Sequence, residues 1–136
     1  MRVLTFLVLV LLSSPVIAGE DACSKAQQQA IELLGWIPPE IDTQNALVGV
    51  GIVSRLAKNV IMIDASIAFT DALGGAIGPG PLALPRDWQL SASGRGGIPI
   101  LAPGYLRLAE VDQKYITATL CTRAVLYDDG TKEFFE

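Results

Sequence analysis

The feature that most constrains the fold is an alternation of apolar and polar residues from position 61 to position 70. Apolar side chains occupy every second position, namely Ile61, Ile63, Ala65, Ile67 and Phe69. A period of two is typical of an extended strand that buries one face. We therefore predict a central strand over residues 60–70, with Asp64 and Ser66 on the opposite face.

Shorter stretches with the same period lie on both sides of this strand. They predict further strands around Val48, Val50 and Ile52, around Trp88, Leu90 and Ala92, around Leu106 and Leu108, and around Ile116, Ala118 and Leu120. The segment 128–131, Asp-Asp-Gly-Thr between two apolar stretches, predicts a closing hairpin. Residues 74–85 contain too many glycines and prolines for a regular interior strand, and residues 93–97 are predicted to form a glycine-rich loop.

A short helix is predicted ahead of the strands. Ser24 followed by Gln27 is a capping-box pattern, and apolar residues at helical spacing continue to Leu34. Gly35 and the two prolines at 38 and 39 then end the helix, which gives residues 25–34. With six or seven short strands, the pattern predicts a mainly β immunoglobulin-like β-sandwich with a short N-terminal helix. The alternative is an α+β fold in which the helix packs on one antiparallel sheet.

The N-terminus has the pattern of a secretory signal peptide. Arg2 precedes an apolar run over residues 3–12, and Val16-Ile17-Ala18 provides a cleavage site. The apolar run is too short to cross a bilayer. We therefore expect a secreted or periplasmic protein with no transmembrane segment in its mature chain. The predicted division is a signal peptide (1–18), an N-terminal helix and linker (19–40) and a β-sandwich domain (41–136).

The two cysteines, Cys23 and Cys121, lie near opposite ends of the mature chain. A single pair of cysteines in an exported protein usually forms a disulfide. We therefore predict a Cys23–Cys121 bond that fixes the helix to the domain. Two free buried thiols, a retained N-terminal anchor, or lipid attachment at Cys23 are the alternatives, although the acidic residues before Cys23 do not suit a lipoprotein signal.

The composition argues against most catalytic classes and against nucleic-acid binding. The chain has no histidine, which excludes Ser–His and Cys–His nucleophile arrangements and most zinc sites. No phosphate-binding glycine motif is present. The formal net charge of −4 argues against nucleic acid and anionic membrane surfaces. We predict no enzymatic activity, no catalytic residue, no cofactor and no metal.

A few side chains allow both a functional and a structural interpretation. Asp71 and Asp128-Asp129 could bind a calcium ion or act as an acid pair on a glycoside, but aspartates at strand ends commonly bond the turn backbone, which we favour. Trp88 is expected in the core, and Trp36 is expected to fill the space between helix and sheet. Arg95, in the predicted glycine-rich loop, is the candidate for an exposed contact.

Three segments together resemble a known family. Residues 61–78 contain an apolar strand, then Phe-x-Asp-x-x-Gly, then a second strand; residues 54–59 are a polar stretch, and residues 125–131 lead an apolar strand into an Asp-Gly hairpin. This pattern resembles bacterial extracytoplasmic immunoglobulin-like domains of the FxLYD kind. The N-terminal helix and the cysteine pair depart from the plain domain. The resemblance implies a binding or structural role and supplies no catalytic residue.

The function that the sequence favours is an exported, non-catalytic module that contacts a protein or envelope component. Loop 74–85, loop 93–97 or a sheet edge would form its contact surface. The alternative is an exported inhibitor that inserts a loop into a hydrolase, which a protruding rigid loop with an outward side chain would favour. A small enzyme with paired carboxylates is the third possibility, and it requires a pocket with convergent acids.

Overall fold

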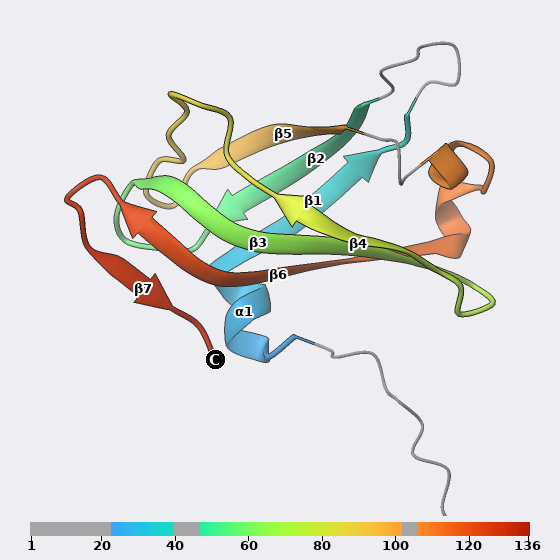
Figure 1. Ribbon diagram of the computed structural model, residues 1–136, viewed down its shortest axis with the longest axis horizontal. Coiled ribbons are helices and arrows are strands. Elements are labelled where there is room, and N and C mark those ends of the chain that lie inside the picture. The colour runs from blue at the N-terminus through green and yellow to red at the C-terminus, as the bar shows by residue number, and fades with distance from the viewer. Residues whose placement is uncertain (1–22, 40–46, 102–105) are drawn as a thin grey trace, which may run out of the picture.

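Two antiparallel sheets pack face to face in the computed structural model, which describes residues 23–39, 47–101 and 106–136 (Figure 1). One sheet has the strand order β1-β2-β5, and the other has the order β4-β3-β6-β7. The elements are α1 (Lys25–Ala30), β1 (Ile31–Ile37), β2 (Leu47–Ser54), β3 (Val60–Asp71), β4 (Ala76–Leu82), β5 (Arg95–Leu101), the 3₁₀ turns η1 (Leu106–Ala109) and η2 (Gln113–Tyr115), β6 (Ile116–Tyr127) and β7 (Lys132–Phe134). The predicted β-sandwich with a short N-terminal helix is confirmed, and the single-sheet alternative is wrong.

The strand order is that of an immunoglobulin-type sandwich with one strand moved. In a constant-type domain the first, second, fifth and fourth strands form one sheet, and the third, sixth and seventh form the other. Here β4 pairs with β3 rather than with β5, so it lies at the edge of the four-stranded sheet. Two prolines in β4 lack amide hydrogens, which suits an edge position and agrees with the prediction that residues 74–85 form no interior strand.

Strand β3 is central, as predicted, with β4 and β6 on its two sides. Four of its buried side chains, Ile63, Ala65, Ile67 and Phe69, alternate along the strand and belong to the core. Phe69 meets the ring of Trp36 from β1 edge-on, with ring centroids 5.0 Å apart. Ile61 is 41% exposed, so its predicted burial is wrong. The pairing with β6 shifts between Val60 and Met62, which leaves Ile61 as an extra residue without a partner in β6. Such a bulge interrupts the alternation, so Ile61 does not point to the buried face as Ile63 does.

The helix is shorter than predicted. The capping box at Ser24 and Gln27 is present, but α1 ends at Ala30 and residues 31–34 belong to strand β1. An isolated six-residue helix is only marginally stable, whereas pairing with β2 satisfies the backbone and buries Ile31 completely. Trp36 is buried within the sandwich as part of β1, and it does not lie between a helix and a sheet.

Three other local predictions are wrong. The segment around Leu90 forms only a single bridge, to Val60, and Trp88 is 43% exposed rather than part of the core. Residues 95–101 form β5, so Arg95 lies in a strand rather than in a glycine loop. The segment around Leu108 is the 3₁₀ turn η1, which buries Leu108 without strand pairing. Around Leu90 and Leu108, an alternation of only two or three residues was too short to determine the local conformation, and the glycines at 94, 96 and 97 hid a strand that forms by pairing with β2.

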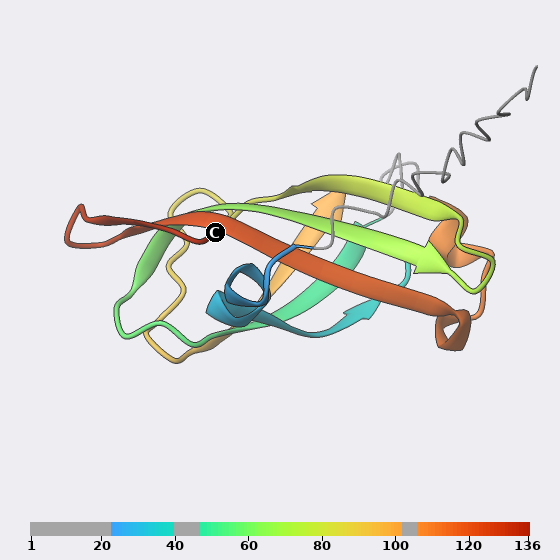
Figure 2. The same ribbon diagram turned by 90° about the horizontal axis from the view of Figure 1, so that it is seen from below.

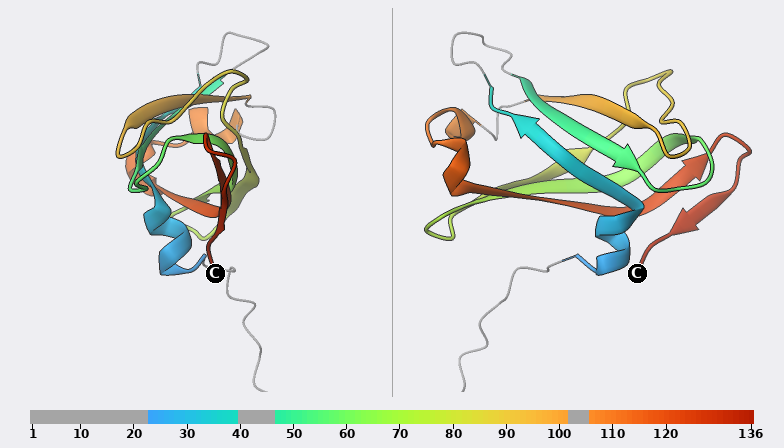
Figure 3. Two further views of the ribbon diagram at one scale, coloured as in Figure 1. Left: turned by 90° about the vertical axis from the view of Figure 1, so that its left-hand side faces the viewer. Right: turned by 180° about the vertical axis from the view of Figure 1, so that it is seen from behind.

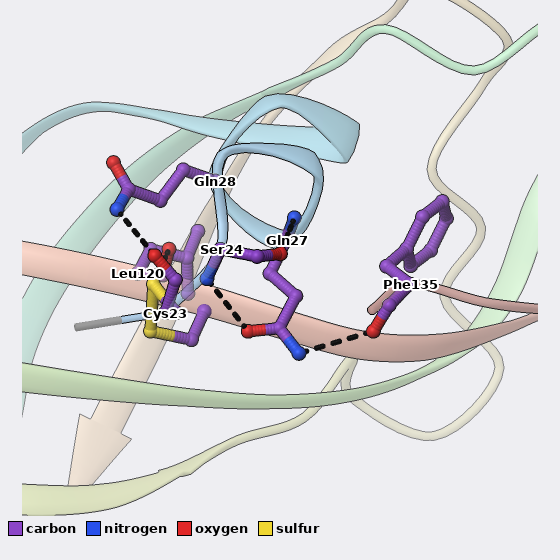
Figure 4. The surroundings of a disulfide bond; sticks show 7 residues. Cys23, Ser24, Gln27, Gln28, Leu120 and Phe135 are labelled. Atoms are coloured by element: carbon purple, nitrogen blue, oxygen red, sulfur yellow. Dashed lines mark hydrogen bonds between the residues drawn. A yellow bond between two sulfur atoms is a disulfide. The ribbon is translucent and has the colours of Figure 1, made fainter. Parts of the chain in front are cut away.

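The disulfide between Cys23 and Cys121 joins α1 to the middle of β6, with the two Cα atoms 5.6 Å apart (Figure 4). Strand β7 pairs only with residues 124–126 of β6. The helix lies beside β6 beyond the end of β7, and Gln27 Nε2 donates a 3.0 Å hydrogen bond to the carbonyl of Phe135 (Figures 1 and 4). The helix and the disulfide therefore cover part of a strand edge that β7 leaves open.

The hairpin of β6 and β7 is confirmed, with Gly130 in the left-handed conformation at its turn. Figures 2 and 3 show the two layers from other directions.

The predicted signal peptide, residues 1–18, lies outside the described residues. Among the residues that are described, no helix has the length and apolar character needed to span a bilayer.

Candidate functional site

The outer face of the β1-β2-β5 sheet carries a shallow apolar trough of about 470 Å³. Every residue that lines it is apolar or glycine. Its floor is formed by Gly35, Gly51 and Gly97, and Leu34, Ile37 and Pro99 stand beside the floor. We call this surface the glycine face.

The three floor glycines form one row across the sheet. Gly35 pairs with Gly51, and Gly51 pairs with Gly97, so one glycine comes from each strand. Paired residues in neighbouring strands point to the same face, and the row is therefore a strip without side chains. The alternate residues of β2, Val48, Val50 and Ile52, point inward and are buried in the core.

Nothing inside the fold requires glycine at these positions. A Cβ atom added to Gly35 or Gly97 would meet no atom within 4 Å, and one added to Gly51 would make only ordinary contacts, the nearest at 3.6 Å. None of the three has a positive φ. Gly75 is different, because a Cβ there would lie 2.6 Å from Asp71 Oδ2. Since glycine within a strand lowers stability, the floor row is a cost that the sandwich itself does not explain.

The side of the trough formed by β1 is raised by two aliphatic side chains. Leu34 is 52% exposed and Ile37 is 70% exposed. Leu34 is the extra residue of an irregularity between Leu33 and Gly35, and such bulges change the direction of a side chain. Ile37 lies against Gly49, the next glycine of β2. The trough therefore has an aliphatic ridge on β1 and an open floor at Gly97 on β5.

The charges of this face lie at one end, in the row next to the glycines. Glu32 of β1 pairs in register with Val53 of β2, which pairs with Arg95 of β5. Arg55 Nη2 donates a 2.7 Å hydrogen bond to Glu32 Oε2, and this bond raises the pKa of the Arg55 guanidinium. Arg95 is exposed, as predicted, and lies in the row beside the glycine face; its role as a contact residue stays a prediction.

Asp71 stabilises a rigid turn at the tip of the β3–β4 hairpin, at the right of Figure 1. Its Oδ1 accepts hydrogen bonds from the backbone N–H groups of Leu73 (2.9 Å) and Gly75 (2.8 Å), and Arg107 donates to its Oδ2 at 3.0 Å. The bond from Gly75, more than those from Leu73 and Arg107, holds the pKa of the carboxyl below its usual range despite partial desolvation. Leu73 at the tip is 94% exposed.

The other two candidate aspartates lie at the opposite end of the four-stranded sheet, in the β6–β7 turn at the left of Figure 1. Asp129 accepts hydrogen bonds from Lys58 and Thr131, which hold its pKa well below the usual range. Asp128 accepts from Asn59. The structure therefore does not bring Asp71 together with this pair, and the described residues include no group of three or more metal-ligating side chains.

The glycine face was not predicted as a site, although the sequence contains a signal for it. Val-Gly-Val-Gly-Ile at 48–52 alternates large apolar residues with glycine, where a half-exposed strand would usually carry polar side chains. Such an alternation predicts a strand that buries one face and leaves the other bare.

The comparisons with known proteins supply no relative: no family model matches the chain, and no similar curated protein or solved structure is found. The resemblance to FxLYD-type domains therefore stays a prediction.

Proposed function

We propose that the protein is an exported, non-catalytic binding module and that the glycine face is its binding surface. The observation that carries this proposal is the row of Gly35, Gly51 and Gly97. Glycine inside a strand lowers stability and often marks a place where another molecule approaches the backbone closely. Because the fold has room for a side chain at Gly35 and Gly97, contact with a partner is the physical reason we assign to the row.

The lining of the trough indicates the kind of partner. Burying a charged group against a wholly apolar surface is costly, so the contacting part of the partner is apolar. The trough is open and shallow, whereas small-molecule sites usually enclose most of their ligand. A protein surface fits this geometry better than a small ligand does.

Export is supported by the disulfide and by the leader pattern. Disulfides form and persist in oxidising compartments outside the cytosol. If the leader is cleaved as predicted, N-terminal sequencing of the secreted protein will begin at Gly19 or within a few residues of it. Full-length protein retained in the cytosol would contradict export.

The binding surface is tested with two matched variants. Gly97→Leu adds a side chain where a Cβ meets no neighbouring atom, and Arg123→Glu alters the outer face of the other sheet. Each immobilised protein is exposed to envelope extract of the source cells, and the captured proteins are quantified after each variant has been shown to be folded at the temperature of the experiment. We expect Gly97→Leu to lose a captured protein that wild type and Arg123→Glu retain. Equal capture by all three would show that the glycine face does not bind.

A second candidate function, inhibition of a hydrolase, is favoured by the β3–β4 turn. Leu73 is almost fully exposed on a turn held by hydrogen bonds to Asp71, which is the rigid loop with an outward side chain that an inhibitor needs. The test is a panel of extracellular proteases and glycosidases. Inhibition by wild type and by Gly97→Leu, but not by Leu73→Ser, would support this function. Wild-type protein that inhibits none of them would exclude it for that panel.

A further inference from the structure

We propose that the partner of the glycine face is a second copy of this chain, docked face to face through the same surface. This inference rests on the proposed binding role of that face. Three rows of paired residues cross β1, β2 and β5 on this face. In an interface with two-fold symmetry, one patch must be complementary to itself.

The strand order defines the symmetry. A two-fold axis in the interface, parallel to the central strand β2, turns a second copy so that its β1 lies above β5 of the first. Each row stays at its own level along the axis, so residues of one row meet residues of the same row. The rows are Glu32–Val53–Arg95, Gly35–Gly51–Gly97 and Ile37–Gly49–Pro99.

The shape of the face is complementary to itself under this rotation. Leu34 is the extra residue of the irregularity in β1, next to the Gly35–Gly51 pair, and its side chain is exposed. The rotation places Leu34 above Gly97 of the second copy, where no atom lies within 4 Å of an added Cβ. The ridge on β1 thus meets the open floor on β5, and it does so twice in the dimer. Packed sheets accept such aligned stacking at a separation of about 10 Å.

The charges are complementary under the same rotation. Glu32 and Arg95 lie in one row on opposite edges of the sheet, with Val53 between them. The axis therefore brings Arg95 of each copy above Glu32 of the other. Within one chain, Arg55 already forms an ion pair with Oε2 of Glu32. A two-fold axis perpendicular to the strands would instead place β1 on β1 and separate Glu32 from Arg95.

The size of the face determines the strength we expect. Three strands about 4.8 Å apart and about seven residues long give a footprint of roughly 15 by 20 Å. This footprint, about 300 Å² per chain, is smaller than that of stable protein interfaces, so the dimer is weak and depends on concentration. Association is then sensitive to the charge pairs, because mutual attraction of opposite charges contributes both to encounter and to register.

Sedimentation equilibrium of the secreted, disulfide-bonded protein from about 5 µM to about 1 mM tests the inference, a range chosen for a small interface. We expect the wild-type mass to rise from one chain toward two. Arg95→Glu and Glu32→Arg should each weaken association about tenfold or more, because like charges then face each other. An equimolar mixture of these two variants should regain the wild-type association, since both Glu–Arg contacts return in the mixed pair. Arg123→Glu is the control on the other sheet and should associate like wild type.

Three results would overturn this inference: wild type with the mass of one chain over the whole range, a mixture that stays monomeric, or loss of association in the Arg123→Glu control. The outcome is separable from that of the proposed function. If wild type is monomeric while Gly97→Leu still abolishes capture of another protein, the second copy is not the partner but the glycine face still binds. If wild type dimerises and Gly97→Leu dimerises equally well, the dimer uses another surface.

Discussion

The two outer faces of the sandwich differ in how their exposed positions are used. On the four-stranded sheet, Arg123 of β6 donates a 2.7 Å hydrogen bond to Asp64 of β3, and exposed Thr117 lies near the start of β6. On the three-stranded sheet, the corresponding central positions are Gly49 and Gly51. The centre of the three-stranded face therefore lacks side chains where the four-stranded face carries polar ones, and the charged residues Glu32 and Arg95 lie at one end of it.

The outer faces can differ in this way because the stability of the sandwich depends mainly on its inner faces. A sandwich is stabilised by its two inner faces, which interdigitate, and the outer faces contribute little to the core. The outer face of the four-stranded sheet carries polar side chains such as Asp64 and Arg123 beside the exposed apolar residues Met62 and Phe134. The three-stranded sheet has glycine at Gly35 and Gly97, where the fold has room for a side chain. The proposed binding role depends on this property.

The largest effect is expected from the disulfide, which joins the segment leading through α1 into β1 of the three-stranded sheet to β6 of the four-stranded sheet. Replacing Cys23 and Cys121 by serine should lower the free energy of unfolding by about 2–4 kcal/mol, because the unfolded chain gains the freedom of a long open loop. Urea unfolding of the oxidised protein and the double variant measures this. Hydrogen exchange should show α1 released, whereas an unchanged midpoint would mean that the bond is not needed to hold the edge.

The next effect concerns alkaline pH and Tyr127 of β6. Burial, followed by the hydrogen bond to Glu133, raises the pKa of this phenol to about 12. The neutral form is favoured in the folded state, so its contribution is complete below pH 10 and is lost as the pH rises from about 10 to about 12; we expect about 1–2 kcal/mol. Denaturant unfolding at pH 8–12 tests this prediction, and Tyr127→Phe should remove that part of the loss. An identical alkaline profile for the variant would contradict it.

A smaller effect compares the two outer faces directly. Gly97→Val should raise the free energy of unfolding of the monomer by about 0.5–1 kcal/mol, since the site is open and glycine costs chain entropy. Thr117→Gly on the other sheet should lower it by a similar amount. Thermal unfolding at low concentration measures both. Destabilisation by Gly97→Val would show that the fold requires that glycine after all.

The smallest effect is expected from the ion pair of the four-stranded face. The side chains of Arg123 and Asp64 are 62% and 58% exposed, and such pairs contribute little. Arg123→Ala should change the free energy of unfolding by less than about 0.5 kcal/mol. Chemical unfolding in low and high salt measures it, and a loss above about 1 kcal/mol would mean that this face has a structural role.

The sequence predicted the features that depend on neighbouring residues and missed those that depend on pairing between distant strands. Strand β3 was predicted because its alternation is long and local, and only Ile61 was misplaced, because a bulge depends on the partner strand. Residues 31–34 have helical spacing, but pairing with β2 decided their conformation. The turn role of Asp71 was also predicted, since it depends on hydrogen bonds within five residues.

The glycine face could not be predicted in the same way. Gly35, Gly51 and Gly97 are distant in the sequence, and they form a row only through the registers of β1 with β2 and of β2 with β5. A shift of one residue in either register would send a neighbouring side chain into the row. The sequence placed Arg95 in a loop for the same reason, because nothing local indicates that β5 pairs with β2.

The covering of the β6 edge has a consequence for the order in which the protein matures. At the opposite edge, β4 carries two prolines that cannot donate to an added strand, and this protection is present as soon as the segment is synthesised. The β6 edge is closed only when the first cysteine of the domain reaches the second, close to the end of the chain. Before oxidation, the β6 edge of the four-stranded sheet is therefore open to pairing with a neighbouring chain. The interval before the two thiols are oxidised is the period in which intermolecular strand pairing, and hence aggregation, competes with folding.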